Sequence, residues 1–119
     1  MARLLFVEDH PDVHDFICEL LKEHGHETDC VWTKTDAEEA LRTNEYDLVI
    51  SNMGLPDGSG YDVAMAARER GTYTLLITGD PAESEKLAGS GFECLPKPFL
   101  APELIRIVEH HLRSRALAR

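Results

Sequence analysis

The sequence predicts an α/β fold, a doubly wound five-stranded parallel sheet with five helices, in one domain that spans residues 1–119. The main observation is an alternation: short apolar runs take turns along the chain with segments whose apolar residues recur at helical spacing. Such alternation requires right-handed crossovers, which place helices on both faces of a parallel sheet. A second observation is that polar residues follow four of the predicted strands, at the sheet edge where ligand sites of such folds form.

The first strand is predicted over residues 4–7, and the first helix follows it. Pro11 suits the first turn of a helix, because its missing N–H would have no partner there in any case. Gly25 is placed to end this helix in a left-handed conformation. Between these two residues the apolar side chains recur at helical spacing: Val13, Phe16, Ile17, Leu20 and Leu21.

The next segment, residues 27–32, is less apolar, so we place this second strand at an edge of the sheet. Thr35 and Glu38 have the T-x-x-E spacing of a capping box, in which two side chains satisfy free backbone N–H groups at a helix start. This pattern predicts a short second helix over residues 36–43.

A third strand is predicted at the apolar run of Leu48, Val49 and Ile50, and it ends at Asn52. The carboxyl ends of parallel strands are where reactive groups gather, so Asn52 is expected at the mouth of the functional site. Four loop-forming residues stop the strand: Gly54, Pro56, Gly58 and Gly60.

The second half of the chain continues the same alternation. Gly71 is expected to close the third helix, and Gly89 and Gly91 limit the length of the fourth. The predicted elements are a helix over 63–70, a strand over 74–78, a short helix from Pro81, a weak strand over 92–95, a rigid Pro96-Lys97-Pro98 turn, and a helix from Pro102.

The formal net charge of −10 argues against direct nucleic-acid binding, because affinity for phosphate backbones rests on clustered Lys and Arg. No apolar run approaches the ~20 residues of a membrane span, and the N-terminus lacks the pattern of a signal peptide. The sequence therefore predicts a cytoplasmic protein that does not bind a membrane. The last segment is locally basic and forms either a partner-facing surface or a solvated helix face, through Arg106, Arg113, Arg115 and Arg119.

The three cysteines, Cys18, Cys30 and Cys94, are an odd number without C-x-x-C spacing. We therefore expect no disulfide, a reduced cytosol, and cysteines that act as small core residues. His10 and His14 are four residues apart, but no third ligand is evident, so they are expected to be solvated.

The rim formed by the strand ends is expected to bring together five side chains: Glu8, Asp9, Asn52, Thr78 and Lys97. Glu8 and Asp9 with an Asn52 oxygen and a backbone carbonyl such as that of Gly54 would suit Mg²⁺, which prefers oxygen ligands. Taken singly, the two acids could equally cap the first helix, and Thr78 could be an ordinary strand end. Together, a cation, a hydroxyl and a lysine fixed between prolines are suited to handling a phosphoryl group.

These motifs resemble the receiver domain of two-component response regulators, of the chemotaxis-regulator type, over essentially the whole chain. The resemblance rests on FVED, LVISNMGLPDGSG, LLIT and LPKPF in this order. It implies a flavodoxin-like fold with strand order 2-1-3-4-5, which is taken from the family. It also implies metal binding by Glu8 and Asp9, a phosphoacceptor position at residue 52, a switch hydroxyl at Thr78, and phosphoryl contact by Lys97.

Three residues depart from the family pattern. Glu8 replaces a more usual aspartate, and Cys94 stands where the family generally has an aromatic switch residue. Asn52 stands where an aspartate accepts the phosphoryl group, and an amide is a very poor nucleophile. Either the natural protein has lost its phosphoacceptor, or an aspartate was changed to lock a working receiver in its unphosphorylated state.

The expected function is therefore that of a non-enzymatic signalling protein in phosphorelay signal transduction. In one hypothesis, it is a Mg²⁺-dependent response regulator that receives phosphate from a histidine kinase or phosphotransfer protein, with Asn52 blocking the reaction. It would then present helix four, strand five and helix five to a target protein. In the alternative, it is a pseudo-receiver that binds partners independently of phosphorylation. The absence of a linker after Met1 favours a stand-alone regulator over an excised receiver.

A flavodoxin-like cofactor binder is disfavoured, because no glycine-rich phosphate loop follows the first strand. A hydrolase of the aspartyl-phosphate type is disfavoured by Asn52.

Overall fold

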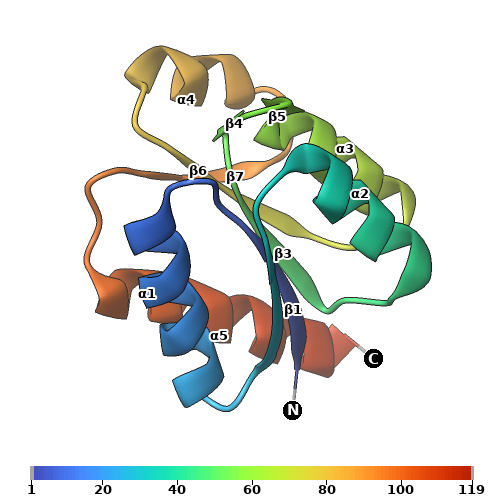
Figure 1. Ribbon diagram of the computed structural model, residues 1–119. Coiled ribbons are helices and arrows are strands. Elements are labelled where there is room, and N and C mark those ends of the chain that lie inside the picture. Colours follow the sequence, from blue (N-terminus) through green and yellow to red (C-terminus); the bar gives the residue numbers. More distant parts are fainter. Residues whose placement is uncertain (1, 119) are drawn as a thin grey trace.

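The computed structural model describes residues 2–118 of the protein, with the side chains of residues 2–115. Its centre is a five-stranded parallel sheet with strand order β2-β1-β3-β6-β7 (Figure 1). The elements are β1 (Arg3–Val7), α1 (Pro11–Glu23), β2 (Glu27–Val31), α2 (Lys34–Thr43), β3 (Leu48–Asn52), β4 (Gly54–Leu55), β5 (Gly58–Ser59), α3 (Gly60–Glu69), β6 (Thr74–Thr78), α4 (Pro81–Leu87), β7 (Glu93–Pro96) and α5 (Ala101–Ala118). The predicted fold class and strand order are confirmed, since β6 and β7 are the predicted fourth and fifth strands.

The sheet is buried on both faces, which explains why its strands are continuous apolar runs. Leu4 and Phe6 of β1 pack against α1 and α5, whereas Leu5 and Val7 pack against α2 and α3. A third cluster, around Leu76 of β6, lies beneath α4. Successive side chains of a strand point to opposite faces, so each run of four apolar residues serves two helical layers.

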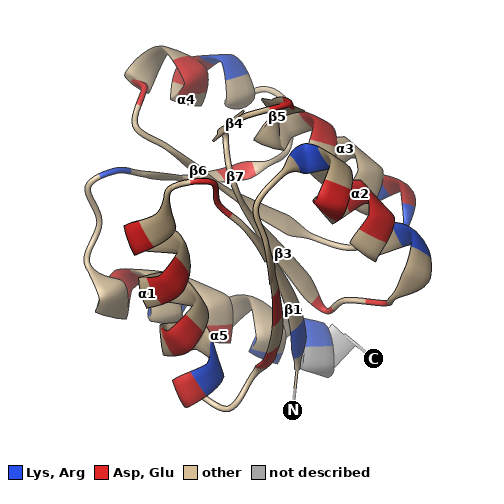
Figure 2. Cartoon of the chain, in the orientation of Figure 1, with Lys and Arg blue, Asp and Glu red and all other residues tan. Residues whose placement is uncertain are grey.

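Many of the charged residues lie on helices. Acidic residues recur along α1 and α2 (Figure 2). Among the residues that the structure describes, no helix is both long enough and apolar enough to cross a membrane.

The start of α2 differs from the prediction. Thr33 caps the helix by accepting from the backbone N–H of Asp36 at 3.0 Å, so the predicted capping box of Thr35 and Glu38 is wrong. The Thr35 hydroxyl instead donates to Asp57 at 2.6 Å. The Thr35 hydroxyl, which the local pattern predicted to cap the helix, is therefore hydrogen-bonded to a side chain of a loop that is distant in sequence.

The loop after β3 is more ordered than predicted. Its residues form the two-stranded hairpin of β4 and β5, and α3 begins at Gly60, three residues before the predicted start at Val63. A Cβ atom added to Gly60 would lie 2.2 Å from the carbonyl oxygen of Asn52. Only glycine lets the chain pass this close to the end of β3.

The expectation of no disulfide is wrong, because Cys18 of α1 and Cys30 of β2 are bonded, with their Cα atoms 6.2 Å apart. Cys94 is a free thiol. An odd cysteine count shows that one thiol is left over, but it does not show whether the other two meet. Their proximity arises because α1 folds back along the edge strand that follows it.

Candidate functional site

The sheet register places four of the predicted site residues along one rim. Val7 lies opposite Ser51, Asn52 opposite Ile77, and Thr78 opposite Pro96. Glu8 and Lys97 come directly after β1 and β7, and the Lys97 backbone N–H donates to the Thr78 carbonyl at 2.8 Å. The structure therefore brings Glu8, Asn52, Thr78 and Lys97 to the carboxyl ends of four adjacent strands.

Glu8 is completely buried at this rim, whereas Asp9 beside it is exposed. The Glu8 Oε1 atom accepts from the His10 backbone N–H at 3.1 Å. The Oε2 atom has no hydrogen-bond partner, and its nearest cation is the Lys97 Nζ atom at 4.0 Å. A buried carboxylate oxygen is costly without a hydrogen bond or a cation.

The main chain of Glu8 is held from two sides. Its N–H donates to the Val31 carbonyl at 3.1 Å, and its carbonyl accepts from the His14 Nδ1–H at 2.9 Å. His14 is buried and stacks on Trp32 with ring centroids 3.5 Å apart, so the prediction of a solvated His14 is wrong. The spacing of His14 could have predicted its burial, since His14 lies on the same helix face as the buried Ile17 and Leu21.

Asn52 is half-buried at the end of β3. Its Nδ2 atom donates to the Gly54 carbonyl oxygen at 2.8 Å. That carbonyl is the one predicted to contribute to a metal site, so the amide already uses it. A carboxylate at position 52 has no proton to donate at neutral pH and would lack this bond.

Thr78 is buried, and its hydroxyl is engaged within the protein. It donates to the Glu83 carboxylate of α4 and accepts from the Asp80 backbone N–H at 3.1 Å. Sequence reasoning missed Glu83. The available signal was its position in the first turn of the helix that follows Thr78.

Lys97 and Cys94 lie at and beside the end of β7. The backbone of Lys97 is held between Pro96 and Pro98, and the Lys97–Pro98 peptide bond is cis. Cys94, at the predicted switch position, is half-buried, with its Sγ atom 3.7 Å from the Ser84 Oγ atom of α4. It packs beside the cluster that includes Met53 and Leu87. The small thiol thus faces α4, where a larger ring would need more space.

The hairpin after Asn52 is tied to the start of α2 by Asp57. Its carboxylate accepts from the Thr35 hydroxyl at 2.6 Å and from the backbone N–H groups of Lys34 and Thr35 at 2.7 and 2.9 Å. These hydrogen bonds, the hydroxyl first, lower the pKa of Asp57 to about 2. Sequence reasoning did not single out Asp57, whose P-D-G context marks a turn but not its distant partner.

The donor set fits a hard cation such as Mg²⁺. Within the described part of the chain, no three His, Cys, Asp or Glu side chains lie close enough to hold a metal together. Further ligands would therefore have to be amide or carbonyl oxygens, as predicted for Asn52 and Gly54. The buried Glu8 Oε2 atom, which has no hydrogen-bond partner, is the observation that supports this fit.

Comparison with known proteins gives the family. The model of the response regulator receiver domain matches residues 4–109. The chain is 35% identical to the response regulator protein PmrA of Pseudomonas aeruginosa and 32% identical to the transcriptional regulatory protein DltR of Streptococcus agalactiae. These alignments cover 97% and 98% of this chain but 56% and 54% of the relatives, so the chain spans about half the length of the curated relatives it matches.

A solved structure shows the same fold. The receiver domain of the sensor histidine kinase PA1611 from Pseudomonas aeruginosa superposes with a TM-score of 0.83 at 24% identity, covering 93% of this chain and 97% of that one. The family model matches residues 4–109, which is most of the sequence, and this match shows that the chain belongs to the response regulator receiver domains. It is thus a domain of the two-component regulatory systems.

Proposed function

We propose that this chain is a single receiver domain of a phosphorelay, built to hold a phosphoryl group at residue 52 and kept unphosphorylated by Asn52. Attack on phosphorus requires an electron pair on a nucleophilic oxygen, which an aspartate carboxylate supplies and a neutral amide does not. With aspartate at this position, the phosphoryl group would pass from the donor to a carboxylate oxygen, and the donor group would leave. The rest of the rim keeps the residues that this transfer needs.

Each remaining residue has a proposed role. Lys97 would neutralise charge on the phosphoryl oxygens, and Thr78 would donate a hydrogen bond to one of them once Glu83 releases its hydroxyl. Glu8, Asp9, an oxygen of residue 52 and the Gly54 carbonyl would hold Mg²⁺, which supplies positive charge when bound. The PA1611 receiver domain, which shares the fold, has a magnesium ion coordinated in its active site cleft.

One observation carries the proposal: a carboxylate oxygen of Glu8 is buried at the rim without a hydrogen-bond partner, 4.0 Å from the Lys97 ammonium. A purely structural acid would be expected to have its hydrogen bonds satisfied inside the protein. The unused lone pairs of the Glu8 Oε2 atom are instead suited to bind a cation from solution.

The test is to restore the carboxylate with Asn52→Asp and incubate the variant with acetyl phosphate and Mg²⁺. We expect intact-mass spectrometry to show the mass of one added phosphoryl group, and a chelator to abolish the reaction. The unchanged chain and the double variant Asn52→Asp/Lys97→Ala are the matched controls and should react little. Absence of phosphorylation in a folded Asn52→Asp variant that binds Mg²⁺ would refute the proposal.

A second candidate is a phosphorylation-independent interaction module. Two hydrogen bonds favour it, because Asn52 donates to Gly54 and Thr78 donates to Glu83, so both side chains are satisfied without any ligand. In this case the Asn52→Asp variant would be phosphorylated poorly. Target binding by the unchanged chain would equal that of any phosphorylated Asn52→Asp variant.

The partners follow from the same proposal. A histidine kinase or phosphotransfer protein would supply the phosphoryl group, and a target protein would bind the surface of α4, β7 and α5. The net charge of −10 argues against direct contact of this domain with nucleic acid. The proposed function is that of a cytoplasmic regulator that binds other proteins and has no enzymatic activity.

A further inference from the structure

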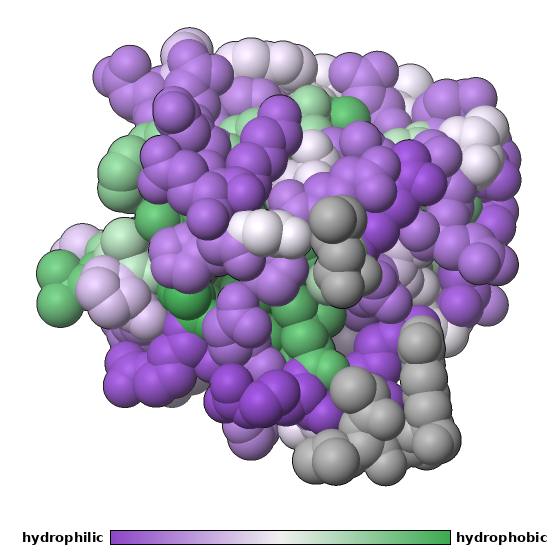
Figure 3. Space-filling model, turned by 90° about the horizontal axis from the view of Figure 1, so that it is seen from below, coloured by the Kyte–Doolittle hydropathy of each residue, from purple (hydrophilic) through white to green (hydrophobic). Residues whose placement is uncertain are grey.

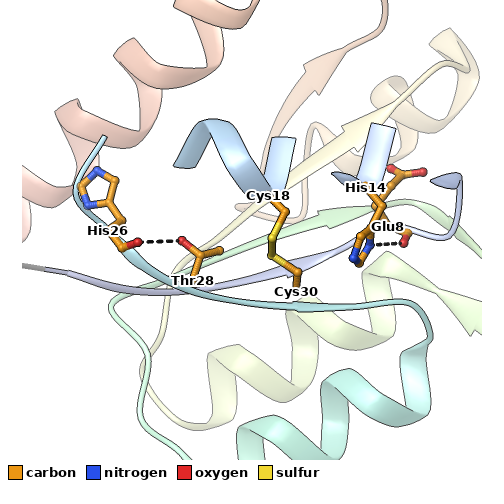
Figure 4. The surroundings of a disulfide bond; sticks show 6 residues. All are labelled: Glu8, His14, Cys18, His26, Thr28 and Cys30. Atoms are coloured by element: carbon orange, nitrogen blue, oxygen red, sulfur yellow. Dashed lines mark hydrogen bonds between the residues drawn. A yellow bond between two sulfur atoms is a disulfide. The ribbon is translucent and has the colours of Figure 1, made fainter. Parts of the chain in front are cut away.

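A disulfide joins α1 to the edge strand β2 beside the loop that carries Glu8 (Figure 4). Both Cys18 and Cys30 are half-buried. Cys18 also lines an open pocket of about 700 Å³ along α1, together with His14 and Asp15. Because both cysteines are half-buried and Cys18 borders this pocket, we expect a reductant from solution to reach the bond.

Each end of the disulfide lies close to a group that holds the main chain of Glu8. On α1, His14 is one turn before Cys18 and donates to the Glu8 carbonyl at 2.9 Å. On β2, Val31 follows Cys30 directly and accepts from the Glu8 N–H at 3.1 Å. The disulfide thus joins α1 and β2, the two elements that form hydrogen bonds with the main chain of Glu8.

A second contact between these elements offers a reporter. Trp32, the only tryptophan of the chain, follows β2 and stacks on His14 with ring centroids 3.5 Å apart and an interplanar angle of 8°. Any movement of α1 away from β2 would separate these rings. The environment of Trp32 therefore reports on the same contact that positions Glu8.

We propose that Cys18 and Cys30 form a reversible redox modification site, and that its oxidation fixes Glu8 and strengthens divalent-cation binding at the rim. The effect on cations rests on the proposed function. The effect on the Glu8 main chain does not. A disulfide in a cytoplasmic protein is usually transient, and that is the setting proposed for this chain.

The chemical step is exchange with a dithiol. One thiolate of the reductant attacks the sulfur of Cys18, the sulfur–sulfur bond breaks, and Cys30 leaves as a thiolate that takes up a proton. The second thiolate of the reductant then attacks the reductant sulfur that is bonded to Cys18. This bond breaks, and Cys18 leaves as a thiolate that takes up a proton. The protein gains two electrons and two protons, and the dithiol becomes a disulfide. Oxidation is the reverse, with an oxidised protein dithiol as the acceptor.

The experiment compares the full chain in oxidised form and after reduction by dithiothreitol. Free-thiol titration should give one thiol before reduction and three after it, since Cys94 is already free. We expect hydrogen exchange at the Glu8 amide to be about tenfold faster in the reduced protein, with a shift in Trp32 fluorescence. Mg²⁺ affinity should fall severalfold on reduction, in this chain and in Asn52→Asp.

The matched control is the double variant Cys18→Ser/Cys30→Ser, which should behave like the reduced protein and ignore dithiothreitol. Equal Glu8 exchange and equal Trp32 fluorescence in both redox forms would overturn the inference, as would three free thiols that excess oxidised glutathione cannot join. If Mg²⁺ binds neither form of Asn52→Asp while exchange and fluorescence still change, the proposed metal site fails and the redox coupling to Glu8 stands.

Discussion

The two ends of the sheet carry polar clusters that differ in how their acids are satisfied. At the amino-terminal end, the Arg3 guanidinium donates to Asp29 at 3.1 Å and to Asn44 at 3.0 Å. The Tyr46 hydroxyl donates to Asp29 at 2.7 Å, and burial and this acid raise the pKa of Tyr46. Asp47 accepts from the Arg3 backbone N–H at 2.9 Å. Hydrophilic residues cover most of this face (Figure 3).

At the carboxyl-terminal end, Asn52 and Thr78 have hydrogen-bond partners within the protein, but Glu8 is not fully satisfied. Glu8 keeps one buried oxygen without a hydrogen bond, and Lys97 is its nearest cation at 4.0 Å. The comparison teaches that clustered charge alone does not mark a site. The acids Asp29 and Asp47 at the amino-terminal end accept hydrogen bonds from protein donors, whereas one oxygen of Glu8 has no hydrogen-bond partner.

The largest expected effect is that of Asn52→Asp on both cation binding and stability. The new carboxylate joins Glu8 and Asp9, and repulsion between close charges should lower the metal-free stability by up to a few kcal/mol at an effective dielectric near 20. Mg²⁺ should bind the variant more tightly than the unchanged chain. Urea unfolding in a chelator and a Mg²⁺ titration measure the two effects.

The matched control is Asn44→Asp at the other end of the sheet, which adds the same charge and should leave Mg²⁺ affinity unchanged. Equal Mg²⁺ affinities for the unchanged chain and Asn52→Asp would refute the prediction.

Lys97→Met should destabilise the protein by about 1–3 kcal/mol, because the buried Glu8 carboxylate loses its nearest cation. Glu8→Gln should be neutral or stabilising in the absence of metal, while it weakens Mg²⁺ binding. The comparison is made by urea unfolding of the single variants and the double variant. If Lys97→Met costs the same in the Glu8→Gln variant as in the unchanged chain, the two charges are not coupled.

Arg3→Met tests the amino-terminal cluster and should cost about 1–2 kcal/mol, through the lost hydrogen bonds to Asp29 and Asn44. A lower melting temperature in calorimetry would show the loss. Mg²⁺ affinity should not change, and a change there would mean that the two ends of the sheet do not act separately.

The smallest effect is expected at the exposed Asp57. Its folded-state pKa of about 2 lies below the ordinary value of 3.8, so its hydrogen bonds to Lys34 and Thr35 stabilise the fold above about pH 4. This contribution should be lost as the pH falls from about 4 to about 2. Asp57→Asn should flatten that part of the stability profile measured by urea unfolding, and an unchanged profile would contradict the assignment.

Local patterns predicted the elements because each depends on neighbouring residues. Pro11 and Gly25 marked α1, and the φ of +86° at Gly25 is the left-handed conformation that a closing glycine adopts. The apolar runs of β1, β3 and β6 needed no partner to be recognised as buried strands. The start of α2 was misplaced because Asp57, more than twenty residues away in the sequence, engages Thr35.

The candidate site was predictable in its members but not in its bonds. The carboxyl ends of neighbouring parallel strands lie side by side whatever side chains they carry. The sequence therefore predicted that Glu8, Asn52, Thr78 and Lys97 lie along one rim. The partners of these residues could not, since Glu83 and His14 reach them only through the way α4 and α1 dock on the sheet.

The alternation of strands and helices, the polar residues at the strand ends and the amide at position 52 were all evident from the sequence alone. These depend on periodicity and residue type, which are local properties of the chain. Three features became evident only in the folded molecule: Cys18 is bonded to Cys30, His14 is buried, and one oxygen of Glu8 has no hydrogen bond. Each of these depends on how a helix docks against the sheet, and docking is set by packing among residues far apart in sequence.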